Sequence, residues 1–138
     1  MKMSRIESAI RLALEFNKAF NRLDVAGMMQ FISDDCIFEN AAPAPEGAIY
    51  AGKVAIAQFW QNFFHRSPQA HTEIEEVFGL GPFRCVMRWK CNWVDLAGEK
   101  RYIRGVDIFK VRDDLICEQL SYVKGAYGNE QISFEVSR

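Results

Sequence analysis

The stretch that decides the fold is YIRGVDIFKV, residues 102–111, whose apolar and polar side chains alternate as they do in a half-buried β-strand. Successive side chains of a strand point to opposite faces, so Arg104 and Lys110 share one face while Gly105, Asp107 and Phe109 share the other. Asp107 is then the only ionisable group on the more apolar face, where an unpaired carboxylate is costly. We expect Asp107 to be either paired with a neighbour or functional.

The first half of the chain has helical periodicity. Apolar residues recur at spacings of three and four over residues 4–23, which predicts one long amphipathic helix. Asp24 is a plausible N-cap for a short second helix that runs to Phe31. A third helix with a very aromatic inner stripe is predicted over residues 53–65.

A short strand is expected over residues 36–39, and the loop over residues 40–47 contains two prolines that exclude regular structure. From Thr72 onward, apolar residues recur with a period of two. Short turns separate the later strands, which therefore pair antiparallel in sequence. These strands are predicted at residues 72–79, 83–94, 100–111 and 115–124.

Composition sets limits on the class of protein. A chain of 138 residues with 49% hydrophobic and 25% charged content predicts a single domain over residues 1–138. The net charge of −1 argues against a nucleic-acid partner. No apolar stretch is long enough to span a membrane, and we expect a cytoplasmic protein. Four scattered cysteines and two histidines form no metal-binding pattern, so we predict no metal and buried, reduced thiols.

Helices first and a meander of strands afterwards predict an α+β domain in which three N-terminal helices pack in a curved, mostly antiparallel sheet. This order of elements resembles the nuclear transport factor 2-like superfamily, whose domains are cone-shaped α+β barrels. Within it, the run RGVDIFKVRDDLI, residues 104–116, closely resembles the family of SnoaL-like polyketide cyclases and their uncharacterised relatives. The resemblance covers the chain to about Gly125, and this fold hosts enzymes and binding modules alike.

The ketosteroid isomerases of this superfamily are similar to the chain without gaps from Phe16 to Asn40. Their general base, an aspartate, is matched by Asn40, which cannot take up a proton near neutral pH. Their oxyanion-hole tyrosine is matched by Phe16, which has no hydroxyl group. Only their protonated aspartate has a counterpart, Asp107; that isomerase is itself the standard worked example of an acid kept neutral by an apolar site. Steroid isomerisation is therefore not the expected reaction.

Limonene-epoxide hydrolase is similar in the loop that carries Asn40 before a proline-rich stretch. The resemblance places the arginine of its catalytic relay at Arg88, but its two aspartates fall on Lys90 and Ser121. The SnoaL-type cyclases also have an acid near the position of Ser121. Neither the epoxide mechanism nor the parent cyclase mechanism is carried over intact.

The remaining catalytic candidates are Asp107 and Asn40, an acid and an amide that can together hold a carbonyl or hydroxyl oxygen and move one proton. This chemistry suffices for a lyase, isomerase or cyclase that acts without a cofactor on a small apolar carbonyl compound. The alternative is a module that binds a small ligand without catalysis, or one that serves for dimerisation. The candidate substrate-binding residues are Phe38, Phe59, Arg88, Trp89, Phe109 and Ser121.

The length of the loop at residues 95–98 determines which side chains of the preceding strand share a face with Asp107, and the sequence allows two lengths. A three-residue bulged loop puts Met87 and Trp89 on the face of Asp107, whereas a four-residue loop puts Arg88 and Lys90 there. The acid would be neutral in an aromatic box in the first case and an ionised partner of arginine in the second.

Two expectations concern association. Strands that are apolar on both faces need cover on both sides, so we predict a homodimer formed through the outer surface of the sheet. The tail over residues 127–138 is expected to be an extra strand or an arm that binds a partner.

Overall fold

The computed structural model describes residues 2–124, so the expected role of the tail over residues 127–138 lies outside the described residues. Helix α1 comprises Lys2–Asn21, α2 comprises Val25–Met29 and α3 comprises Lys53–Arg66. Asp24 caps α2, because its Oδ1 accepts a hydrogen bond of 2.9 Å from the backbone N–H of Gly27. The three predicted helices and this cap are confirmed.

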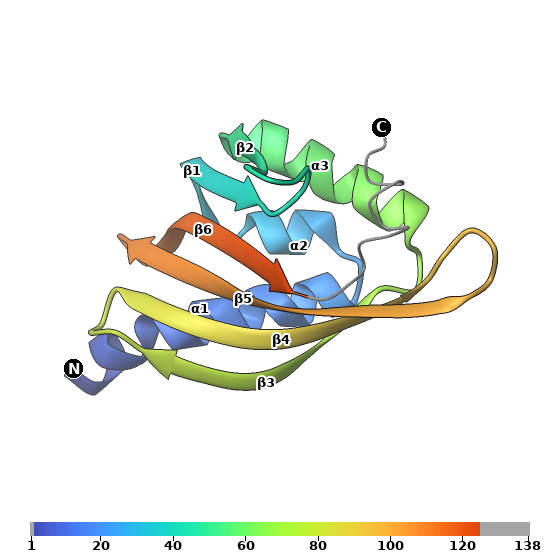
Figure 1. The fold of residues 1–138 in the computed structure, drawn as a ribbon. Coiled ribbons are helices and arrows are strands. Elements are labelled where there is room, and N and C mark those ends of the chain that lie inside the picture. The colour runs from blue at the N-terminus through green and yellow to red at the C-terminus, as the bar shows by residue number, and fades with distance from the viewer. Residues whose placement is uncertain (1, 125–138) are drawn as a thin grey trace.

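Six strands form one sheet in the order β2-β1-β6-β5-β4-β3 (Figure 1). Its pairing is antiparallel except between β1 and β6, which run parallel and join the first half of the chain to its last described strand. The strands comprise Ile32–Asn40 (β1), Ala48–Ala51 (β2), His71–Gly79 (β3), Arg84–Val94 (β4), Lys100–Arg112 (β5) and Leu115–Lys124 (β6). The sheet is curved but unclosed, since β2 and β3 are its two edges.

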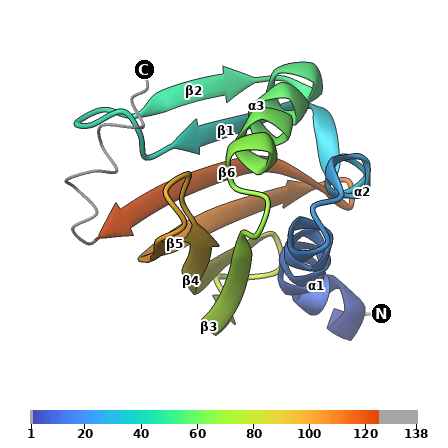
Figure 2. The same ribbon diagram turned by 90° about the vertical axis from the view of Figure 1, so that its right-hand side faces the viewer.

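The helices lie on one side of the curved sheet, as Figures 1 and 2 show from two directions. Helix α1 packs against β3 and β4, and α3 packs against β1 and β2. Small residues of α1, such as Ala9 and Ala13, are fully buried and let the helix approach the sheet closely. The predicted α+β architecture is confirmed. Of the helices within residues 2–124, none combines the length and hydropathy that a membrane crossing needs.

The turn between β4 and β5 fixes the register of the central hairpin. The N–H of Asp95 donates to the carbonyl of Glu99 at 2.9 Å, which closes a loop of only residues 96–98. Gly98 supplies the positive φ of 85° that this loop requires. Asp107 is therefore opposite Met87 in the ladder, and Trp89 is opposite Gly105. The first of the two alternatives for this turn is the one that the chain adopts.

Candidate functional site

Asp107 lies in the middle of β5 and points into the interior, where only 6% of its surface is exposed. The side-chain amide of Gln119, on the neighbouring strand β6, donates from Nε2 to Oδ2 of Asp107 at 2.9 Å. The other carboxyl oxygen, Oδ1, is buried without a hydrogen-bond partner. Because buried polar atoms normally have a partner, this oxygen marks a position that a further polar group can fill.

Burial raises the pKa of Asp107 above its ordinary value of 3.8, because the charged form loses its hydration. Gln119, Ser121 and Trp89 oppose this shift and lower the pKa. Among the described residues, only Gln119 forms a hydrogen bond of full geometry with Asp107; Ser121 and Trp89 lie close to the carboxyl group without one. Trp89 Nε1 is therefore a nearby donor that is still free to bind.

The position of Trp89 depends on a glycine in the facing strand. A Cβ atom at Gly105 would come within 2.5 Å of Cζ2 and 2.7 Å of Cη2 of the Trp89 indole. The indole therefore lies against the bare backbone of β5, two residues along the strand from Asp107. Glycine in a strand often marks such a close approach, and here it allows the N–H of Trp89 to lie beside the acid.

Aromatic side chains fill much of the rest of the interior. Phe38 of β1 contacts Phe59 and Trp60 of α3, with ring centroids 5.2 Å and 5.3 Å apart. Phe109 is fully buried and packs edge-on against Phe16 of α1. Trp60 Nε1 is a second indole N–H that is buried without a partner. The interior is therefore apolar and carries a few unsatisfied polar atoms, a composition typical of ligand sites.

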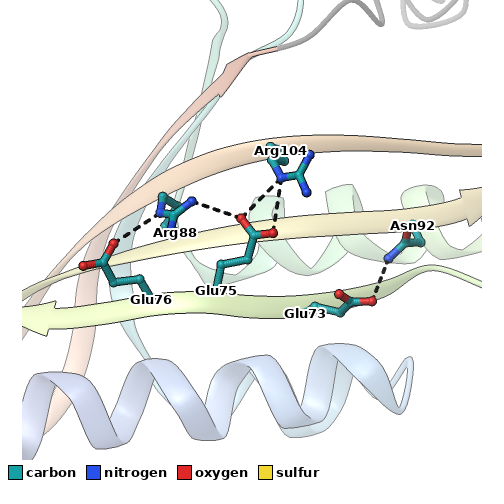
Figure 3. A network of polar contacts seen from close by, with 6 residues as sticks. All are labelled: Glu73, Glu75, Glu76, Arg88, Asn92 and Arg104. Atoms are coloured by element: carbon teal, nitrogen blue, oxygen red, sulfur yellow. Dashed lines mark hydrogen bonds and ion pairs between the residues drawn. The ribbon is translucent and has the colours of Figure 1, made fainter.

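Arg88 does not belong to this interior, which corrects its assignment as a substrate-binding residue. The register of the hairpin puts it on the outer face of the sheet, where it forms ion pairs with Glu75 at 3.2 Å and Glu76 at 3.3 Å (Figure 3). Arg104 of β5 also reaches Glu75, at 3.2 Å. The side chains of β4 nearest to Asp107 on the inner face of the sheet are thus Met87 and Trp89, and neither of them is a cation.

Asn40 ends β1, and its Nδ2 donates to the carbonyl oxygen of Ala42 at 3.2 Å, within the proline loop. No hydrogen bond joins Asn40 to Asp107. Ser121, by contrast, is directly opposite Asp107 in the ladder between β5 and β6. Of the residues predicted from the sequence, the structure brings Trp89 and Ser121 to the acid, and a link from Asn40 through a ligand oxygen stays a prediction.

Sequence reasoning missed one residue of this site and one unsatisfied donor elsewhere in the interior. Gln119 occurs in a run with no apparent polar pattern, and only the pairing of Phe109 with Gln119 across β5 and β6 shows that its amide faces inward. Trp60 was attributed to the aromatic stripe of α3, and nothing in that stripe indicates an unsatisfied N–H. The rule that glycines in strands mark close approaches could have drawn attention to Gly105 and its partner.

Residues 2–124 also contain cysteines and other side chains of the types that ligate metals. The four cysteines are free and buried, as predicted, and burial raises the pKa of Cys36 and Cys85 to about 12. No group of three or more His, Cys, Asp or Glu side chains in this part of the chain is placed to hold a metal. A depression of about 390 Å³ near the β4–β5 hairpin, lined by Trp93, Lys100 and Tyr102 among others, does not include Asp107.

A curved, unclosed sheet around helices, with a polar group buried in its concave side, defines the class of nuclear transport factor 2-like domains. Known proteins agree with this classification. A nuclear transport factor 2-like protein of unknown function from Mesorhizobium loti is 33% identical, with 88% of this chain and 94% of that chain covered and a TM-score of 0.73. The family model of the SnoaL-like domain matches residues 13–119. The chain belongs to the SnoaL-like family.

More distant structures share the fold. A putative polyketide cyclase from Xanthomonas campestris pv. campestris is 22% identical, covers 88% of this chain and 93% of its own, and has a TM-score of 0.72. TerC, co-crystallised with polyporic acid, is 16% identical and has a TM-score of 0.78. The match covers 91% of this chain and 98% of the TerC chain. The comparison with curated proteins gives no match.

Proposed function

We propose that the protein binds a small apolar compound through a carbonyl or hydroxyl oxygen in the interior of the cone, and that Asp107 exchanges a proton with it. The observation that carries this proposal is the buried Oδ1 of Asp107, which has no partner and belongs to a carboxyl group close to the equally unpartnered N–H of Trp89. An acid whose pKa is raised by an apolar site can hold a proton and exchange it with a bound ligand. Such a group supports a lyase, isomerase or cyclase that needs no cofactor.

Ligands of proteins with the same fold are consistent with this chemistry. TerC was crystallised with polyporic acid, and a Mycobacterium tuberculosis protein with 19% identity was crystallised in complex with estradiol-17β-hemisuccinate. Both names describe compounds with oxygen on a largely apolar skeleton. A small ligand of this type suits an interior lined by Phe38, Phe59 and Phe109.

The aromatic packing favours an alternative function. Phe38, Phe59 and Trp60 contact one another, so side chains of the protein fill this part of the interior. In the alternative, the domain binds a small ligand or a second chain without catalysis, and Asp107 only anchors the ligand. The two functions differ in whether a proton is transferred.

Proton exchange in heavy water separates these functions without knowledge of the natural substrate. We expect the protein to accelerate the exchange of the methyl protons of acetophenone for deuterium, because this exchange proceeds through the enol. Proton NMR follows the loss of the methyl signal, with buffer at the same pH as the reference. Binding of acetophenone without faster exchange would favour the non-catalytic alternative.

We also propose that the outer face of the sheet forms a homodimer. Val86, Ile108 and Leu120 are opposite one another across β4, β5 and β6, and Val106 and Tyr122 form the next row. Tyr122 is 57% exposed, and the other four side chains are half-buried although no described helix covers this face. A patch of this kind flanked by charged rows is typical of a protein interface.

The substitution Ile108→Lys is expected to convert the dimer into a monomer, because it puts a charge at the centre of the patch. Sedimentation or light scattering at micromolar concentration measures the change. Val54→Lys is the control, since Val54 is 86% exposed on α3 and its replacement should leave the dimer intact. A wild-type protein that is already monomeric would refute the interface.

A further inference from the structure

Gln119 has a contact that the proposed function leaves unexplained. Its Nε2 donates to Oδ2 of Asp107, and both side chains are more than nine-tenths buried. The amide thus occupies one carboxyl oxygen and leaves the other one bare. This asymmetry decides which oxygen of the acid a ligand can meet.

We propose that Gln119 is a positioning residue, which holds Oδ2 and thereby presents Oδ1 of Asp107, together with Nε1 of Trp89, as a two-point site for one ligand oxygen. The proposal rests on the proposed function, because it takes Asp107 as the group that contacts the ligand. It adds the side chain that orients the acid and the class of oxygen that the site accepts.

Hydrogen-bond chemistry gives the reason for the assignment. A neutral carboxyl group has one carbonyl oxygen, which accepts, and one hydroxyl oxygen, which donates. Because the carbonyl oxygen is the stronger acceptor of a neutral carboxyl group, the hydrogen bond from the amide of Gln119 favours Oδ2 as the carbonyl oxygen and Oδ1 as the oxygen that carries the proton. The indole N–H of Trp89 is also a donor and nothing else. The neutral site therefore offers two donors to a single acceptor, as a ketone or aldehyde oxygen requires.

The ionised site accepts a related group. Oδ1 is then an acceptor while Trp89 Nε1 is still a donor, and a hydroxyl group satisfies both at once. When transfer of the proton from Oδ1 to a bound carbonyl oxygen is accompanied by loss of an α-proton of the ligand to water, ionised Asp107 is left beside the hydroxyl group of the enol, so the protons balance and both states are matched. A ligand ammonium group would satisfy Oδ1 but would leave the indole N–H without an acceptor.

The decisive experiment compares two probes of the same shape, acetophenone and α-methylstyrene, in which a methylene group replaces the oxygen. Binding is measured from the indole N–H resonance of Trp89, which is readily assigned because the chain has three tryptophans. The wild-type protein should bind acetophenone about tenfold more tightly, as expected for one or two hydrogen bonds. Gln119→Met should reduce this preference to about threefold or less and leave the affinity for α-methylstyrene unchanged.

Two further variants separate positioning from a merely structural role. Gln58→Met makes the same change on the exposed surface of α3 and should keep the wild-type preference. Gln119→Glu should keep the preference at a pH where the new carboxyl group is protonated and can donate to Oδ2, and lose it at higher pH. An unchanged preference in a folded Gln119→Met protein would overturn the role of Gln119.

The remaining outcomes distinguish this inference from the proposed function. Equal affinity of the wild-type protein for both probes would refute the two-point oxygen site but leave apolar ligand binding intact. If neither probe binds, the proposed function fails, and carbon NMR titration of the Asp107 carboxyl group in the free protein tests Gln119 alone. We expect a higher titration midpoint in Gln119→Met than in wild type; the same midpoint in both proteins would overturn the positioning role.

Discussion

Asp107→Asn is expected to lower the proton exchange of a bound ketone by the ~10²–10⁴-fold that the loss of a general acid or base typically costs. The amide keeps the shape of the side chain and can accept the hydrogen bond from Gln119, but it has no proton to transfer. The folded structure should be as stable as wild type or more stable near neutral pH, because the penalty for burying an ionisable group disappears. Asp107→Leu should also fold for the same reason.

The pH dependence of stability gives a second measure of the same substitution. The pKa of Asp107 in the folded protein is raised above the ordinary value of 3.8, so between these two pKa values the folded chain holds a proton that the unfolded chain has lost. The free energy of unfolding then falls as pH rises through this interval, by up to ~1.4 kcal/mol per pH unit. Asp107→Asn lacks this decrease. The difference in the free energy of unfolding between Asp107→Asn and wild type should therefore grow with pH and then level off.

Asp113→Asn is the matched control for both measurements. Asp113 is exposed and has a positive φ of 55°, a conformation that asparagine tolerates well, so its replacement should leave both the fold and proton exchange intact. Thermal melting over a range of pH and the heavy-water assay provide the data. A large loss of stability in Asp107→Asn with unchanged exchange would mean that Asp107 is structural, and the enzymatic function would be refuted.

Gly105→Ala is expected to be the most disruptive small change in the site. The new Cβ would lie 2.5 Å from the Trp89 indole and 2.6 Å from the backbone carbonyl oxygen of Tyr122, and this second contact cannot be relieved by a side-chain rotation. Overpacking of this kind costs about 1–3 kcal/mol. For a chain of this size, the upper part of that range lowers the melting temperature by about 10 °C.

Gly79→Ala is a suitable comparison, since the nearest atom to its Cβ would be 3.4 Å away, an ordinary contact, and the expected change in melting temperature is small. The resonance of the Trp89 indole N–H should move in Gly105→Ala and stay in place in Gly79→Ala. A fully stable Gly105→Ala protein with an unmoved Trp89 resonance would show that this close approach does not position the indole.

Much of the fold was predictable because its elements are long and periodic. The alternation over residues 84–94 and 100–112 and the helical spacing of α1 identified elements whose ends agree within a few residues. The short strand β2 was missed, because four residues between Gly47 and Gly52 are too few to reveal a period. Strand β1 was predicted too short, since a bulge between Ile32 and Ile37 interrupts its alternation.

The site was harder to predict than the fold, because it depends on pairing between distant strands. The alternation of β5 was enough to single out Asp107. The choice between Arg88 and Trp89 as its neighbour depended on one residue in the turn at residues 95–98, and both loop lengths were compatible with the sequence. Gln119 could not be assigned at all, since only the register of β6 against β5 brings its amide to the acid.

The two edges of the unclosed sheet bear on how these molecules can associate. An edge strand exposes backbone N–H and C=O groups that can pair with another chain and start aggregation. At one edge, β2 is only four residues long. At the other, β3 has a bulge at Glu75 and carries the charged side chains of Glu73, Glu75 and Glu76, which hinder pairing with a further strand. Both edges are thus poor templates for a seventh strand, and growth of the sheet from molecule to molecule is discouraged in the folded protein.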